Sequence, residues 1–126
     1  KHASIAHVHW GSTAADLLPT LKQLKIPVIV SYYGWDVHAP ERKHWYMKRY
    51  REVFERADKL VVLCDYVRDL FIRWGCDPAK IMVWSLPAGV EEYPYRPRTP
   101  GETTRLIIAA RFVPKKGYDV LLPQCT

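Results

Sequence analysis

The chain has 126 residues, of which 48% are hydrophobic and 25% are charged, the composition of an ordinary globular domain. This length allows one hydrophobic core but excludes two complete Rossmann domains, and no apolar run approaches the roughly 18–20 residues of a membrane-spanning helix. The net charge of +6 and the pI near 9.3 favour an anionic partner. Charge alone leaves open whether that partner is a nucleotide, a nucleic acid or a membrane surface.

The first elements are a strand and a helix. Residues 4–10 are expected to form a short strand that Gly11 ends. The next helix is expected to begin at a capping box of Thr13 and Asp16, with Asp in place of the usual Glu. Pro19 lies within this helix and should kink it, because proline removes one backbone donor. Three leucines at helical spacing predict its buried face: Leu17, Leu21 and Leu24.

Strands and helices continue to alternate further along the chain. The expected strands cover residues 27–33, 59–64 and 81–84, which are short apolar runs. The expected helices cover residues 41–58 and the segment from the N-cap Asp65 to Gly75. Their inward-facing residues are Tyr46, Tyr50, Val53, Ala57, Val67, Leu70, Phe71 and Trp74. This alternation predicts an α/β fold with a parallel, Rossmann-like sheet and right-handed crossovers.

The helix over residues 41–58 is strongly basic. Its cations are Arg42, Lys43, Lys48, Arg49, Arg51 and Arg56. Glutamates are interleaved with them, so a solvated face is the default interpretation. The sharper hypothesis is a peripheral membrane contact, because aromatic residues alternate with the cations. We interpret Trp45, Tyr46 and Tyr50 as core and interdomain packing rather than as a platform for a sugar.

Cysteines and histidines, which often bind metals, form no recognised ligand motif. Cys64, Cys76 and Cys125 lack Cys-x-x-Cys spacing, and their odd number favours reduced thiols in a cytosolic protein. Cys64 is interpreted as a small buried apolar residue. His7 and His9 share one face of the first strand, but no third ligand is near in sequence. A two-histidine metal site and histidines that pack or line a pocket both remain open.

A linker is expected over residues 93–104, which contain three prolines and a glycine and have no apolar face. The expected segments are therefore 1–92, 93–104 and 105–126. The last of these begins with an apolar run at residues 106–110, typical of a strand buried on both faces. Both ends of the chain fall inside expected elements, which favours a piece of a larger protein.

A basic loop follows that strand and leads into a helix expected to open at Gly117. Arg111 offers a planar fork suited to phosphate oxygens, and Lys116 adds a point charge. The first amides of a helix are unpaired, and its dipole favours an anion there. The expected apolar side of the helix consists of Val120, Leu121 and Leu122. The segment predicts an anion site, with a solvated basic turn as the alternative.

The run from Ala110 to Gly117 resembles a segment of family 4 glycosyltransferases, which have the two-domain GT-B fold. In that family a Gly-Arg-x4-Lys-Gly sequence opens the C-terminal domain, and Ala110 stands where Gly is usual. The resemblance implies that Arg111 and Lys116, helped by the amides at Gly117, hold the diphosphate of a nucleotide-sugar donor.

Four upstream segments resemble the same family in the same order. Residues 5–11 (IAHVHWG) resemble its His-x-His-x-Gly strand end, and residues 26–36 (IPVIVSYYGWD) resemble the segment with its His-Gly-x-Asp sequence. Residues 57–66 (ADKLVVLCDY) and 80–93 (KIMVWSLPAGVEEY) resemble its next two strands. Members of the exopolysaccharide or colanic-acid type look most similar.

The resemblance also implies an acceptor side formed by His9, Gly11, Gly34 and Asp36. Tyr33 stands where the family has His near the transfer centre. A phenol with a reference pKa of about 10 is a poor base at neutral pH, so the catalytic roles of Tyr33 and Asp36 are left open. Asp36 either contacts the acceptor or makes an Asx-turn. The family's Glu-x7-Glu carboxylate pair and its glycine-rich loop have no counterpart among these residues.

On this resemblance, residues 1–92 belong to the acceptor-side domain, 93–104 form the interdomain linker, and 105–126 begin the donor-binding domain. The parent protein would be a retaining, hexosyl-type glycosyltransferase that uses a UDP- or GDP-sugar, a glycan or lipid-linked acceptor, no cofactor and no required metal. A cytoplasmic location is implied, with the inner face of the membrane as the more specific hypothesis.

Two other classes remain open. A nucleic-acid-binding module is permitted by the pI, but the cations are spread over several elements and no nucleic-acid motif is recognised, so we expect no nucleic-acid partner. A non-catalytic interaction fragment is permitted by Tyr33 and by the missing carboxylate pair.

Overall fold

The structure is a computed structural model that describes residues 3–42, 44–87, 89–95, 97, 101 and 106–125. The chain divides into two compact units, Lys1–Ala88 and Gly89–Thr126. Much of the linker expected over residues 93–104 lies outside the described residues. The predicted domain boundaries therefore remain predictions.

The first unit is built on a four-stranded parallel sheet with the strand order β1-β2-β3-β4. The strands are β1 (Ala6–His9), β2 (Val28–Ser31), β3 (Lys59–Val62) and β4 (Ile81–Val83). The helices are α1 (Gly11–Asp16), α2 (Leu18–Gln23), α3 (Ala39–Arg42), α4 (His44–Arg56) and α5 (Asp65–Arg73). Two 3-10 turns, η1 (Trp35–His38) and η2 (Pro78–Lys80), complete the unit. The predicted α/β, Rossmann-like class is confirmed.

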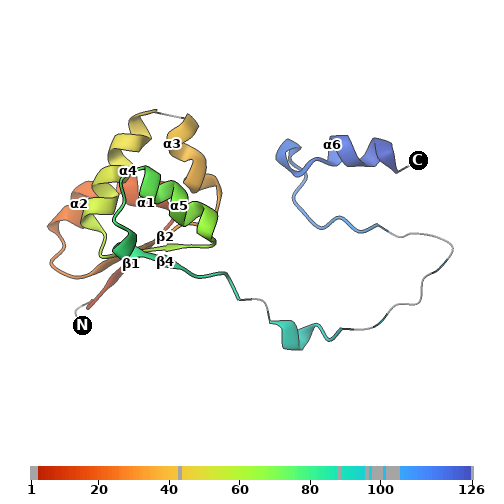
Figure 1. Cartoon of the computed structure of the whole chain (residues 1–126), viewed down its shortest axis with the longest axis horizontal. Helices are drawn as coiled ribbons and strands as arrows, with labels where there is room; N and C mark the ends of the chain where they lie inside the picture. The colour runs from red at the N-terminus through yellow and green to blue at the C-terminus, as the bar shows by residue number, and fades with distance from the viewer. Residues whose placement is uncertain are drawn as a thin grey trace. The chain divides into compact units, whose positions relative to one another are not determined.

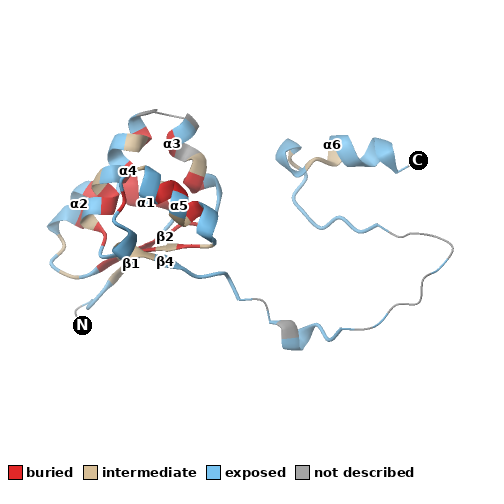
Figure 2. Cartoon of the chain, in the orientation of Figure 1, coloured by how far each residue is buried: buried red, intermediate tan, exposed pale blue. Residues whose placement is uncertain are grey.

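The helices of this unit pack on one face of the sheet (Figure 1). Consecutive strands step across the sheet in one direction, and crossovers of one hand then place each connecting helix on the same face. Alternate strand residues such as Val30 and Leu60 are fully buried. Figure 2 shows buried residues both on the strands and on the helices that cover them. On the opposite face Ile29 and Val61 are half-buried, and Met82 is exposed.

The start of the first helix differs from the prediction. The prediction of a capping box at Thr13 and Asp16 is wrong. Helix α1 begins at Gly11, its N-cap is Trp10, and no side chain caps it. The amide of Gly11 instead donates to Asp36, a residue of the loop after β2. A side chain from elsewhere in the fold thus satisfies the first amide of α1, which local sequence does not reveal.

The buried face of this helical segment also differs. Leu17 was expected inside but is 44% exposed, whereas Leu18 and Leu21 are buried. The helix breaks at Leu17, and α2 starts at the next residue with Pro19 in its first turn. Proline fits that position because no intrahelical donor is needed there. The helix is therefore interrupted near Pro19, as predicted. The break moves the buried position from Leu17 to Leu18.

The inward stripe predicted for the long helix is confirmed, since Tyr46, Tyr50, Val53 and Ala57 are all buried. The N-cap predicted for α5 is wrong. Cys64 holds the N-cap position without a side-chain cap, and Asp65 is the first helical residue.

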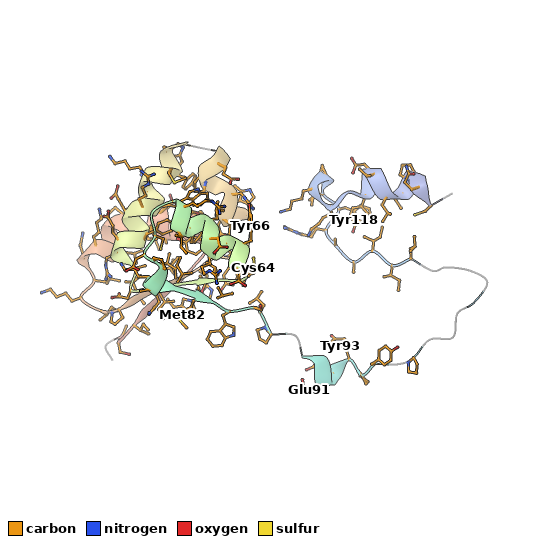
Figure 3. All side chains as sticks on the ribbon, viewed as in Figure 1. Cys64, Tyr66, Met82, Glu91, Tyr93 and Tyr118 are labelled. Atoms are coloured by element: carbon orange, nitrogen blue, oxygen red, sulfur yellow. The ribbon has the colours of Figure 1, made fainter. Side chains whose placement is uncertain are left out.

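The cysteines separate into exposed and buried thiols. Cys64 was expected to be buried but is exposed, because β3 ends at Val62 and Cys64 lies in the turn to α5 (Figure 3). Cys76 is the buried thiol of this unit, and burial raises its pKa to about 11. Cys76 therefore has little thiolate character near neutral pH.

Several cations of α4 contact the protein itself. Arg56 donates to the backbone oxygens of Leu21, Leu24 and Ile26 and so caps the end of α2. Arg49 lies 5.2 Å from the centroid of the Trp45 ring and donates to the Ala15 oxygen. These two cations therefore contribute to packing within the unit, and a peripheral membrane contact stays a prediction.

In its described part, the second unit contains only short helical turns: η3 (Val90–Glu92), η4 (Pro114–Lys116), α6 (Tyr118–Leu121) and η5 (Leu122–Gln124).

The prediction of a strand over residues 106–110 is wrong for this chain. Its described residues form no strand, and Ile107 is 82% exposed. An apolar run needs a neighbouring strand to pair with, and the described part of this unit offers none. The helix after Gly117 is one turn long. Val120 and Leu121 within it and Leu122 directly after it are exposed.

Candidate functional site

The ends of β1 and β2 bring several of the predicted site residues together. His9 is the last residue of β1 and pairs with Ser31 at the end of β2. A hydrogen bond of 2.6 Å joins His9 Nδ1 to the Tyr33 hydroxyl, and the two rings stack with centroids 5.7 Å apart. The carboxyl ends of parallel strands are where α/β proteins bind ligands, because the loops that follow the strands converge there.

Asp36 organises the loops at this edge. Its side chain is fully buried, and Oδ2 accepts the Gly11 amide at 2.9 Å. Oδ1 accepts the amides of Tyr33 at 3.2 Å and Gly34 at 2.9 Å. The Tyr50 hydroxyl donates to the backbone oxygen of Asp36 at 2.7 Å. Amide donors are the usual way to stabilise a buried carboxylate.

These bonds give Asp36 a structural role that differs from the predicted Asx-turn. The carboxylate accepts amides from residues that precede it and from the start of α1, rather than from a residue two positions ahead. Asp36 thereby joins the β1–α1 turn to the loop after β2. A contact between Asp36 and an acceptor stays a prediction.

Gly11 is required by close packing. A Cβ atom at this position would lie 1.9 Å from Cε1 of Tyr32, whose ring is 1% exposed. The Tyr32 ring makes edge contacts with Tyr50 and Phe71. Among the described residues its buried hydroxyl has no hydrogen-bond partner, and burial raises its pKa.

Trp10 is a site residue that the sequence analysis missed. Its φ of 77° lies in the left-handed region, which bulky residues rarely adopt. Strain of this kind costs about 1–3 kcal/mol and recurs at ligand sites. The indole meets the Tyr33 ring edge-on, with centroids 5.1 Å apart. The only available signal was that a tryptophan directly precedes Gly11.

A groove of about 310 Å³ lies on the sheet face away from the helices. Its polar lining includes His7, Ser31 and Tyr33, and its apolar lining includes Val61 and Trp84. His7 Nε2 and Ser31 Oγ are 2.8 Å apart. Partial burial and the neighbouring His9 both lower the pKa of His7. The neutral form of His7 is therefore favoured near pH 7.

A larger hollow of about 540 Å³ is lined by residues of α4 and of the loop before β4, including Arg51, Trp74 and Lys80. It lies beside the amino ends of β3 and β4, the edge that α/β proteins seldom use for ligands. Within the described ranges no group of three or more His, Cys, Asp and Glu side chains could hold a metal ion.

The residues predicted to hold the donor belong to the second unit. Arg111 and Lys116 are exposed, and Gly117 has a left-handed φ of 70°. The Gly117 amide donates to the Pro114 oxygen at 2.9 Å, so this amide is engaged within its turn. The Tyr118 hydroxyl donates to the Ala110 oxygen at 2.6 Å and closes the loop that carries both cations (Figure 3).

The parallel sheet defines a Rossmann-like protein, and a polar and aromatic cluster lies at the carboxyl ends of its strands. Residues 2–87 match the family model described as "Glycosyl transferase 4-like domain", and the chain belongs to this family. The resemblance found in the sequence is thereby confirmed.

Two curated relatives match nearly the whole chain. Both carry the name "Putative colanic acid biosynthesis glycosyltransferase WcaL". The protein of Salmonella typhimurium is 27% identical over 122 residues, and that of Escherichia coli is 25% identical over 122 residues. The match covers 96% of this chain but only 30% of each relative. No solved structure matches the chain.

In the described part of the chain, every helix is too short or too polar to cross a membrane.

Proposed function

We propose that the full-length protein is a glycosyltransferase of exopolysaccharide assembly and that this chain carries the acceptor-side edge of its site. The family match over residues 2–87 and the names of the two relatives support this assignment. The observation that carries it structurally is the His9–Tyr33 pair, held at the carboxyl ends of the strands by the Asp36 hydrogen bonds.

The proposed reaction transfers a hexosyl group, with retention of configuration, from a UDP- or GDP-sugar to a glycan or lipid-linked acceptor. When the bond between the sugar and the diphosphate of the donor breaks, negative charge develops on the diphosphate. Cations held beside this charge stabilise the transition state and so lower the barrier to transfer. Arg111 and Lys116 take this role in the proposal. It requires no cofactor and no metal.

A cytoplasmic location, at the inner face of the membrane for a lipid-linked acceptor, is part of this proposal. A peripheral membrane contact through α4 receives little support, because Arg49 and Arg56 contact the protein itself.

The donor role is tested with Arg111→Ala and Lys116→Ala in the full-length protein. Removing one preorganised charge donor costs about 3–4 kcal/mol in comparable sites, so each variant should lower kcat roughly 10²- to 10³-fold. The measurement is release of nucleoside diphosphate from a panel of UDP- and GDP-sugars. Lys115→Ala is the matched control, because Lys115 is an exposed lysine of the same turn. Near-normal turnover in both variants would contradict the donor role.

A further inference from the structure

The face of the sheet that the helices leave open carries apolar side chains. Ser31, Val61 and Met82 lie in register across β2, β3 and β4, and Met82 is 42% exposed. Trp84, which directly follows β4, is 64% exposed. The groove of about 310 Å³ lies on this face, and none of its lining residues is an aspartate, glutamate, lysine or arginine. Parallel sheets normally have both faces covered, so this face has the composition of a buried surface.

The described connections between the strands do not cover this face. Consecutive strands step from β1 to β4 in one direction, so right-handed crossovers place α2, α4 and α5 together on the other face (Figure 1). By the same rule, a helix on the open face belongs to a connection that steps across the sheet in the opposite direction. Such a connection needs a further strand beyond an edge of the described sheet.

Strand β1 has an edge to which a further strand can add. The amides of Ala6 and Trp10 donate to backbone oxygens on the β2 side. Successive residues of a parallel strand direct their amides to opposite sides, so the amides of His7 and His9 face away from β2. On that side the described residues offer no strand. An open edge of this kind is a template for strand pairing.

The length of the relatives indicates where the missing strand and helix come from. More than two thirds of each relative lies outside its match with this chain. Directly after β4 the chain passes into the second unit, Gly89–Thr126, whose described residues form no strand. The chain after β4 therefore does not extend the sheet at once. A segment that precedes Lys1 leads into β1, the strand with the open edge.

We infer that the segment of the full-length protein before Lys1 adds a parallel strand beside β1 and lays an amphipathic helix across the open face. Apolar residues of that helix, at positions i, i+3, i+4 and i+7, pack into the groove beside Val61 and Met82. β1 then lies inside the sheet, at the point where the direction of the connections reverses. The inference rests on the sheet and is independent of the reaction proposed above.

The first measurement is photo-crosslinking of the full-length protein, grown with photo-methionine, a diazirine analogue close to methionine in size. Mass spectrometry then identifies the peptides that are joined to Met82. We expect an intramolecular crosslink from Met82 to a segment that precedes Lys1. Met47 is the internal control, because it lies on α4, in the helical layer on the other face, and should not join that segment.

The second measurement is the accessibility of a thiol on the open face. In the full-length protein, N-ethylmaleimide should modify the Met82→Cys variant about tenfold more slowly than the Ile72→Cys variant. The two native side chains are similarly exposed here, at 42% and 36%, so Ile72 on α5 is a matched control. Thermal unfolding checks that both variants are folded. The photo-methionine crosslink tests the same face with a side chain close to the native one.

Other results would overturn the inference. Equal rates of modification, or no crosslink from Met82 to a segment outside residues 1–126, would show that the face is open to water. A crosslink to a segment that follows Thr126 would place the covering helix downstream. A crosslink between an isotope-labelled and an unlabelled molecule would identify a second copy of the protein as the occupant.

Discussion

Replacing Asp36 by alanine should destabilise the first unit by at least about 3 kcal/mol, because three amide donors would lose their acceptor inside the fold. A single buried donor left unsatisfied costs about 1–3 kcal/mol, and domains are stable by only about 5–15 kcal/mol. Asp36→Asn should cost less, since one side-chain oxygen remains to accept Tyr33 and Gly34. Its amide nitrogen would then face the Gly11 N–H, which is also a donor.

The measurement is the midpoint of urea unfolding, followed by tryptophan fluorescence. Asp69→Ala is the control, because Asp69 is exposed on α5 and pairs with Arg68 at the surface. It should change the free energy of unfolding by no more than about 0.5 kcal/mol. If Asp36→Ala unfolded at the same urea concentration as the control, the account of this loop would be wrong.

Gly11→Ala should also be strongly destabilising, for a steric reason. The added Cβ would lie 1.9 Å from Cε1 of Tyr32. The Tyr32 ring is buried against Tyr50 and Phe71, so it has no free space to rotate into. Overpacking of a buried site typically costs about 1–3 kcal/mol, and we expect the upper part of that range.

A double-mutant cycle separates this clash from a general effect of losing glycine. Gly11→Ala combined with Tyr32→Leu should be less destabilised than the sum of the single variants, because the smaller side chain vacates the position of Cε1. Gly101→Ala is the control, since no described atom lies within 4 Å of its added Cβ. If the changes in unfolding free energy of the two single variants simply added in the double variant, a clash with Tyr32 would not be the cause of the destabilisation.

The sequence predicted the order and type of the elements in the first unit well. Short apolar runs and period-3.6 patterns are local, so the four strands and the inward stripe of α4 could be identified without a structure. The shift from Leu17 to Leu18 could not, because the exact residue at which a helix breaks depends on tertiary packing. The predicted strand at residues 106–110 shows a related limit, since an apolar run specifies a strand only where a partner strand is present.

Most residues of the candidate site could be predicted from the sequence, but Trp10 and the arrangement of the site could not. The family resemblance named His9, Tyr33 and Asp36, and the fold brings them to one edge of the sheet. The bond from Gly11 to Asp36 joins residues 25 positions apart, and no periodic pattern encodes such a contact. The positive φ of Trp10 likewise has no signature in the residue type.

The measurement that tests the central claim most directly is the sequence of the gene on both sides of this chain. A glycosyltransferase whose donor-binding domain begins with residues 105–126 should carry a Glu-x7-Glu pair within about 150 residues downstream, the length of one domain, and a glycine-rich loop upstream. Finding both would support the account. A stop codon shortly after Thr126 would contradict it, because no donor-binding domain could then follow.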